Sequence, residues 1–205
     1  MVRLEVAGGR VTRASARSDR PRIAGRLFDG RRPDEAPPLA GTLFAICGRA
    51  QAIAAACAIE AAQGREADGP TRAARETRLA AEIAQEHLGR LLVDWPALAG
   101  LPTQVPHYAR ARAHLAPLLA AEPGTPRAAE ADRVAEWAQA VVFGVSPADF
   151  RSLDSVPSFA NWVRGAATPV ADLALAVIER RARLGECDTG LLGAADAALV
   201  ASIAR

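Results

Sequence analysis

The first residues of the chain alternate between apolar and polar side chains, which is the pattern of a β-strand with one buried face. Val2, Leu4 and Val6 are separated by charged residues, and the sequence Ala-Gly-Gly-Arg then leads to a second run that starts at Val11. Two glycines between two such runs favour a tight hairpin turn. We therefore predict a β-hairpin with one face buried, followed by a loop rich in Pro, Asp and Gly from Phe28 to Pro38.

The pattern becomes helical after this loop. The stretch from Thr42 to Gly64 is apolar on nearly every side of a helix, apart from Arg49, Gln51 and Glu60, and Gly64 is placed to end it. A helix that is apolar all round is normally buried. We predict that this is the central and most buried helix of the fold.

A second long helix is predicted from Thr71 to Trp95. Its charged residues, including Glu82, are expected to be solvated on the sides away from an apolar stripe. The apolar residues that recur at multiples of four are Leu79, Ile83, Leu91 and Trp95. We expect this stripe to pack along the first helix.

Three later helix starts are marked by a hydroxyl residue followed by proline. They are Thr125-Pro126, Ser146-Pro147 and Thr168-Pro169. A hydroxyl side chain is a good N-cap, and proline is tolerated at the first helical position. We predict helices over 126–143 and 169–184, and a last helix from Ala194 to Arg205.

Together these elements predict a mainly α protein with a small N-terminal β element (α+β). We expect a single domain over residues 1–205, in which residues 1–38 form the hairpin and loop and residues 42–205 form a helical bundle. No apolar stretch is long enough to span a membrane, and the N-terminus carries arginines where a signal peptide would be apolar. We therefore expect a cytoplasmic protein with no membrane partner.

Charge is distributed unevenly along the chain. Residues 1–32 contain nine arginines against three acidic residues, a net charge of +6, whereas the remainder carries −4. This asymmetry leaves open an all-α nucleic-acid-binding regulator. Neither a helix-turn-helix pattern nor aromatic residues interleaved with the arginines accompany it, so we expect a solvated surface and no nucleic-acid partner.

The chain has three widely spaced cysteines, Cys47, Cys57 and Cys187, and no Cys-x-x-Cys pair, so we expect reduced thiols. Cys47 lies where a loop enters the first predicted helix, and a helix N-terminus favours the thiolate that binds metals or acts as a nucleophile. A small buried apolar side chain is the alternative reading of a cysteine in such a setting. Cys57 is ten residues further on, so it should point well away from Cys47.

The order of these segments resembles the N-terminal third of nickel-iron hydrogenase large subunits. The resemblance runs over about residues 2–98 and is carried by LEVAGGRVTRA, then LFDGRRPDEAPPLAGTLFAICGRAQAIAAACAIEAAQG, then TRAARETRLAAEIAQEHLGRLLVDWP. In that family a β-hairpin leads through a loop to a Cys-x-x-Cys-x-x-x-His motif, then to a small-residue helix and a long arginine-containing helix. The resemblance thus implies a hydrogenase-large-subunit-like helical bundle.

The departures from that family are equally informative. Cys47 occupies the first cysteine position, Ala50 stands at the second, and Ala54 stands at the histidine. Cys187 lies in Glu-Cys-Asp-Thr-Gly, which is unlike the motif that supplies the other two thiolates in that family. Because a nickel-iron site needs four thiolates, we expect a protein that is not an enzyme and that holds no nickel.

The combination Cys-Gly-Arg-Ala-Gln with a later Asp-Trp-Pro resembles hydrogenase assembly proteins of the HupK/HoxV type. This resemblance implies a scaffold on which iron carrying cyanide and carbon monoxide is built or transferred, together with a HypC-type chaperone and other maturation proteins. Cys47 would be the iron ligand and Arg49 would hydrogen-bond a cyanide nitrogen. The alternative is a metal-free mimic of the large subunit that binds chaperones or hydrogenase subunits.

Overall fold

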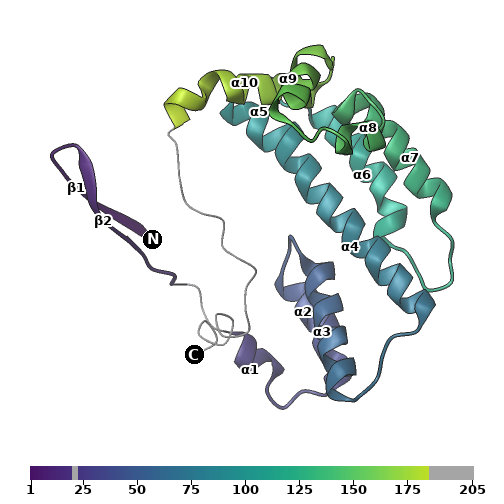
Figure 1. Cartoon of the computed structure of the whole chain (residues 1–205). Helices are drawn as coiled ribbons and strands as arrows, with labels where there is room; N and C mark the ends of the chain where they lie inside the picture. Colours follow the sequence, from purple (N-terminus) through teal and green to yellow (C-terminus); the bar gives the residue numbers. More distant parts are fainter. Residues whose placement is uncertain (20–22, 185–205) are drawn as a thin grey trace. The chain divides into compact units, whose positions relative to one another are not determined.

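The computed structural model describes residues 1–19 and 23–184, and the chain divides into two compact units, Met1–Arg75 and Glu76–Arg205. The described residues are mostly helical and include one two-stranded sheet, which confirms the mainly α class with a small N-terminal β element (Figure 1). None of the described helices combines the length and the apolar character needed to cross a membrane. Cys187 and the predicted helix 194–205 lie outside the described residues, and the single domain over 1–205 stays a prediction.

The first unit opens with the predicted hairpin. Strands β1 (Val2–Ala7) and β2 (Arg10–Ala16) pair antiparallel, with Val6 opposite Val11. Gly8 and Gly9 form the turn with φ of 56° and 74°, which only glycine adopts without strain. Both turn residues therefore have the positive φ that a two-residue hairpin turn requires.

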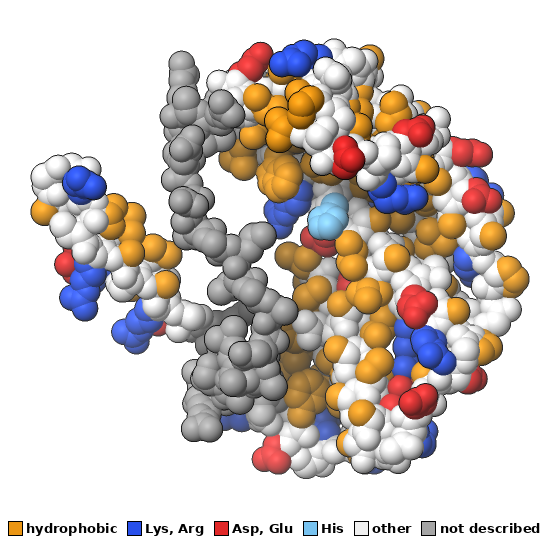
Figure 2. All heavy atoms as spheres, in the orientation of Figure 1, with side chains coloured by type: hydrophobic (Ala, Val, Ile, Leu, Met, Phe, Trp, Pro, Cys, Tyr) orange, Lys and Arg blue, Asp and Glu red, His pale blue; other side chains and the backbone are white. Residues whose placement is uncertain are grey.

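The hairpin has no buried face, so that part of the prediction is wrong. Every residue of both strands is exposed, and Val2 and Leu4 keep 73% and 56% of their surface open. Figure 2 shows apolar side chains open to view along the hairpin, with arginines among them. Alternation along a strand identifies the residues that share a face, but it does not supply the surface that covers them.

The region after the hairpin is more helical than the sequence predicted. Helix α1 (Ala24–Phe28), the 3-10 turn η1 (Pro33–Glu35) and helix α2 (Ala36–Leu43) occupy most of the predicted loop Phe28–Pro38. Pro33 and Pro37 lie in the first turns of their elements, where a missing backbone N–H costs nothing.

The helix predicted from Thr42 to Gly64 is in fact two helices. The chain turns over residues 44–47, and α3 (Gly48–Ala62) then packs against α2. The apolar pattern runs through the break because each helix turns part of its apolar surface toward the other. Gly64, with φ of 63°, ends α3 as predicted.

The expectation that this helix is the most buried element is also wrong. α3 contains no buried residue, whereas the neighbouring α2 contains one, Ala40, which is 5% exposed. An alanine-rich helix that is apolar all round still needs a partner on each side to be buried. Its expected packing along the helix 71–95 stays a prediction.

The second unit holds the core. Its elements are α4 (Gly69–Gly89), which begins in the first unit, the π-helical turn η2 (Arg90–Asp94), α5 (Trp95–Leu98), α6 (Val105–Leu119), α7 (Ala128–Ala138), the π-helical turn η3 (Gln139–Phe143), α8 (Pro147–Arg151), α9 (Val156–Gly165) and α10 (Pro169–Leu184). The helices predicted over 71–95, 126–143 and 169–184 are confirmed, the first two with a π-helical turn at or near the end. Figure 1 shows α4 as the longest of them.

Two of the three predicted caps are confirmed. The backbone N–H of Asp149 donates to the Ser146 hydroxyl at 3.1 Å, and that of Ala171 donates to the Thr168 hydroxyl at 3.2 Å. Thr125 is not a cap, because α7 begins at Ala128 and Arg127 precedes it.

The buried face of α4 and η2 differs from the predicted stripe. Leu88 and Leu92 are 8% and 0% exposed, whereas Ile83 and Trp95 keep 48% each. The π-helical turn changes the rotation per residue after Gly89, and within α4 the small residues Ala74 and Ala81 are buried as well as Leu88. Glu82, expected to be solvated, is 4% exposed. The rest of the core comes from later helices and includes Ala111, Leu115, Leu118, Trp137, Val142, Trp162, Val163, Val170 and Ala171.

Candidate functional site

The structure places Cys47 at the junction between the α2–α3 turn and α3, as the sequence predicted. Cys47 is the N-cap residue of α3, with φ of −118° and ψ of 34°. Its carbonyl accepts the first hydrogen bond of the helix, from the backbone N–H of Gln51 at 3.0 Å. The backbone N–H groups of the first turn of a helix lack intrahelical acceptors, so this end of α3 carries partial positive charge.

Two glycines fix the position of this turn. A Cβ atom on Gly48 would lie 2.4 Å from the carbonyl oxygen of Gly41, and a Cβ on Gly41 would lie 3.2 Å from the carbonyl oxygen of Gly48. The backbones of α2 and α3 therefore touch directly, one residue after Cys47. This contact is not among the sequence predictions, although the Gly41 and Gly48 pair around a short turn is a signal of it.

Cys47 is half-buried, and a polar side chain of its own helix contacts its sulfur. The Gln51 side-chain amide donates to Cys47 Sγ at 3.8 Å. Arg49, the second residue of α3, is exposed. The structure therefore brings Cys47 and Arg49 to the same helical turn, with Cys47 only partly buried.

Two alanines that follow Cys47 in α3 lie on the same helix face as Cys47. Ala50 and Ala54 follow Cys47 by three and seven positions in α3, and such spacings bring side chains onto one face. That face carries methyl groups beside one thiol. Over residues 1–19 and 23–184, no three His, Cys, Asp or Glu side chains gather as a metal site would require.

Cys57 occupies a different environment. It is exposed, and the Arg75 guanidinium lies 3.8 Å from its sulfur. Arg75 also makes two hydrogen bonds of 2.7 Å to the carboxylate of Glu60, in a bidentate pair that is partly buried. From the sequence, Glu60 was expected only as a helix-end charge, and its pairing with Arg75 was not predicted because the pair joins two helices across a turn.

This pair changes the acidity of both partners. The hydrogen bonds from Arg75 lower the pKa of Glu60, and its charge and that of Arg65 act in the same direction. The hydrogen bonds to Glu60 raise the pKa of Arg75, and the nearby Cys57 sulfur adds to this. The pair thus holds the end of α3 to the first turns of α4 and does not engage Cys47.

Comparison with known proteins finds two curated relatives. The chain is 46% identical to the hydrogenase expression/formation protein HoxV of Cupriavidus necator over 78 residues. These residues make up 38% of this chain and 20% of that protein. It is 40% identical to the hydrogenase expression/formation protein HupK of Rhizobium leguminosarum bv. viciae over 82 residues. These residues make up 40% of this chain and 22% of that protein.

No family model and no solved structure matches the chain. The chain thus spans about a fifth of the length of the curated relatives it matches. Over about two fifths of its own length, it is a relative of hydrogenase expression/formation proteins.

Proposed function

We propose that this protein is a non-catalytic accessory protein in the formation of nickel-iron hydrogenase. The single observation that carries the proposal is the position of Cys47: a half-buried thiol at the start of a helix, in a turn fixed by backbone contact, in a chain related to hydrogenase expression/formation proteins. A thiolate in such a place is a good ligand for a soft metal unit.

In this proposal the cargo is iron that carries cyanide and carbon monoxide, and Cys47 is the ligand that this chain contributes. The face of α3 that carries Cys47 has methyl groups at Ala50 and Ala54, so a second ligand would come from a partner. A HypC-type chaperone is the partner we propose. Arg49, exposed in the same turn, would donate a hydrogen bond to a cyanide nitrogen, because a guanidinium carries several N–H donors and stays charged.

The decisive variant is Cys47→Ser. The substitution is nearly isosteric, and the Gln51 amide that now faces the sulfur would face the new hydroxyl, so the fold should survive. A serine hydroxyl is a hard and far less acidic ligand than a thiol. We expect the complex purified without oxygen with a HypC-type chaperone to lose its cyanide and carbonyl infrared bands, and hydrogenase maturation to stop.

Cys57→Ser is the matched control, since it changes a thiol on the same helix that contacts Arg75 and not the α2–α3 turn. It should keep both the infrared bands and maturation, as should Cys187→Ser. Loss of the bands in Cys57→Ser but not in Cys47→Ser would show that the site is on the other thiol. Normal maturation with all three variants would favour the metal-free mimic.

Arg49 has a separate readout. Arg49→Gln should keep the iron but shift the cyanide stretching bands, because a hydrogen bond to the cyanide nitrogen is weakened while the iron ligand is unchanged. Cyanide bands identical to those of the unsubstituted protein would contradict a contact between Arg49 and cyanide.

A further inference from the structure

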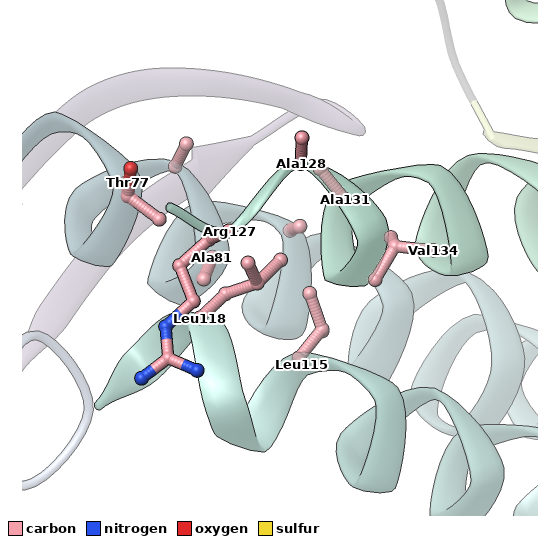
Figure 3. A pocket seen from close by; sticks show the side chains of 10 residues that line it. Thr77, Ala81, Leu115, Leu118, Arg127, Ala128, Ala131 and Val134 are labelled. Carbon is pink, nitrogen blue, oxygen red and sulfur yellow. The ribbon is translucent and has the colours of Figure 1, made fainter. Parts of the chain in front are cut away.

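The second unit contains a groove between α4, α6 and α7 (Figure 3). Its volume is about 500 Å³. The floor is formed by Ala81, Leu115 and Leu118, which are 3%, 1% and 7% exposed. The side chains along the walls are Thr77, Ala80, Ala84, Ala128, Ala131 and Val134 on α4 and α7, and Arg127 just before α7. The lining is therefore almost entirely apolar.

The small side chains of the walls explain why the groove is open. Five of the lining residues are alanines, and their methyl groups do not reach across the space between α4 and α7. Protein interiors are close-packed, so an apolar space of this size is normally filled by side chains. An apolar groove between helices is a common docking site for the apolar face of another helix.

One end of the groove carries positive charge. Figure 3 shows the Arg127 side chain running past Leu118 to its guanidinium. Arg127 Nη1 lies 3.5 Å from Glu130 Oε1, and Arg133 Nη2 lies 3.7 Å from the same oxygen. Arg127 Nε is buried and has no hydrogen-bond acceptor among the described residues. Among the described residues that line the groove, Arg127 is the one that carries a charge, so a helix bound there would meet a guanidinium.

We propose that this groove docks an amphipathic helix of a partner protein, with apolar side chains in the groove and a carboxylate against Arg127. The apolar lining selects side chains spaced three or four residues apart, and the Arg127 guanidinium at one end selects an acidic residue beside them. The groove lies in a different unit from Cys47, so this proposal does not rest on the proposed function.

The test uses the full chain and a synthetic peptide, acetyl-AEALAELLAALEA-amide, titrated by calorimetry. Its leucines lie at the spacing of one helix face, and the glutamate after the last leucine lies beside that face, whereas the other two glutamates keep the opposite face soluble. We expect saturable binding at one peptide per chain. Ala131→Glu, which places a carboxylate in the groove, should weaken binding by about tenfold or more. Arg127→Gln should weaken it by roughly threefold to fivefold, as expected for a partly exposed ion pair.

Two variants are matched controls. Ala135→Glu adds the same charge one turn further along α7, on an exposed residue that does not line the groove, and Arg112→Gln removes an exposed arginine of α6. Both should bind as the unsubstituted chain does. Circular dichroism of all four variants excludes unfolding as the cause of any loss.

Several results would overturn the proposal. Three concern the peptide: absence of saturable binding, equal losses in Ala131→Glu and Ala135→Glu, and equal binding of a peptide with glutamine in place of each glutamate. A fourth comes from sedimentation: if the chain self-associates and only Ala131→Glu abolishes this, the occupant is a second copy of the chain and not a partner helix.

Discussion

Replacing Gly48 by alanine tests the backbone contact that positions Cys47. The added Cβ would lie 2.4 Å from the carbonyl oxygen of Gly41 and 3.4 Å from its carbonyl carbon. A carbon and a carbonyl oxygen in contact are normally at least about 3.3 Å apart. Both atoms belong to backbone or are attached directly to it, so no side-chain rotation relieves the overlap, and α2 and α3 must separate by roughly 1 Å.

The cost follows from this overlap and from one opposing effect. Forcing an extra methyl group into a packed contact typically costs about 1–3 kcal/mol. Alanine is favoured over glycine in a helix by up to about 1 kcal/mol, and less at the first helical residue. We therefore expect Gly48→Ala to destabilise the α2–α3 pair by roughly 1–2 kcal/mol, as the difference between these two effects.

Hydrogen exchange followed by mass spectrometry measures this locally, through the protection of peptides that cover residues 36–62. Gly69→Ala is the matched control, because Gly69 is also the first residue of its helix and a Cβ there would meet nothing within 4 Å. That variant should be neutral or slightly stabilising. If Gly48→Ala and Gly69→Ala changed protection equally, the two helices would not be in backbone contact.

Three further substitutions test other parts of the fold. Because Arg75 lowers the pKa of Glu60, the pair stabilises the native state above the ordinary pKa of 4.5, and this stabilisation is lost as the pH falls through the lowered pKa. Glu60→Gln should remove this loss of stability in acid. An unchanged pH profile of unfolding would contradict the pair with Arg75. Thr168→Val should cost about 1–3 kcal/mol in denaturant unfolding, because the buried hydroxyl both caps α10 and donates at 3.1 Å to a carbonyl of η3. Leu92→Ala, at a fully buried site, should cost about 2–5 kcal/mol, whereas Leu98→Ala, 84% exposed, should cost little; equal effects would show that the core is misplaced.

Local signals in the sequence predicted local structure well. The Gly8-Gly9 turn and the caps at Ser146 and Thr168 depend on residues within four positions of each other, and the structure has all three. The placement of Cys47 at a helix start also came from its immediate neighbours. These features do not depend on what packs against them, so the sequence contains the information that decides them.

Features that depend on distant partners were not predictable in the same way. The break at residues 44–47 lies inside a continuous apolar stretch, and only the contact of Gly41 with Gly48 shows why the chain turns there. The pairing of Arg75 with Glu60 crosses fifteen positions. Apolar pattern likewise predicted burial for α3, but burial depends on the surfaces that surround a helix.

The way in which Cys47 is held allows its chemistry and its position to be tested separately. The turn is fixed by backbone contact between Gly41 and Gly48, so Cys47→Ser changes the ligand without moving the turn, whereas Gly48→Ala moves the turn and keeps the thiol. If Cys47 holds iron, both variants should impair hydrogenase maturation, the first through ligand chemistry and the second through geometry. If a partner recognises only the shape of this region, Gly48→Ala alone should impair it. Maturation with these two variants therefore distinguishes an iron scaffold from a metal-free mimic.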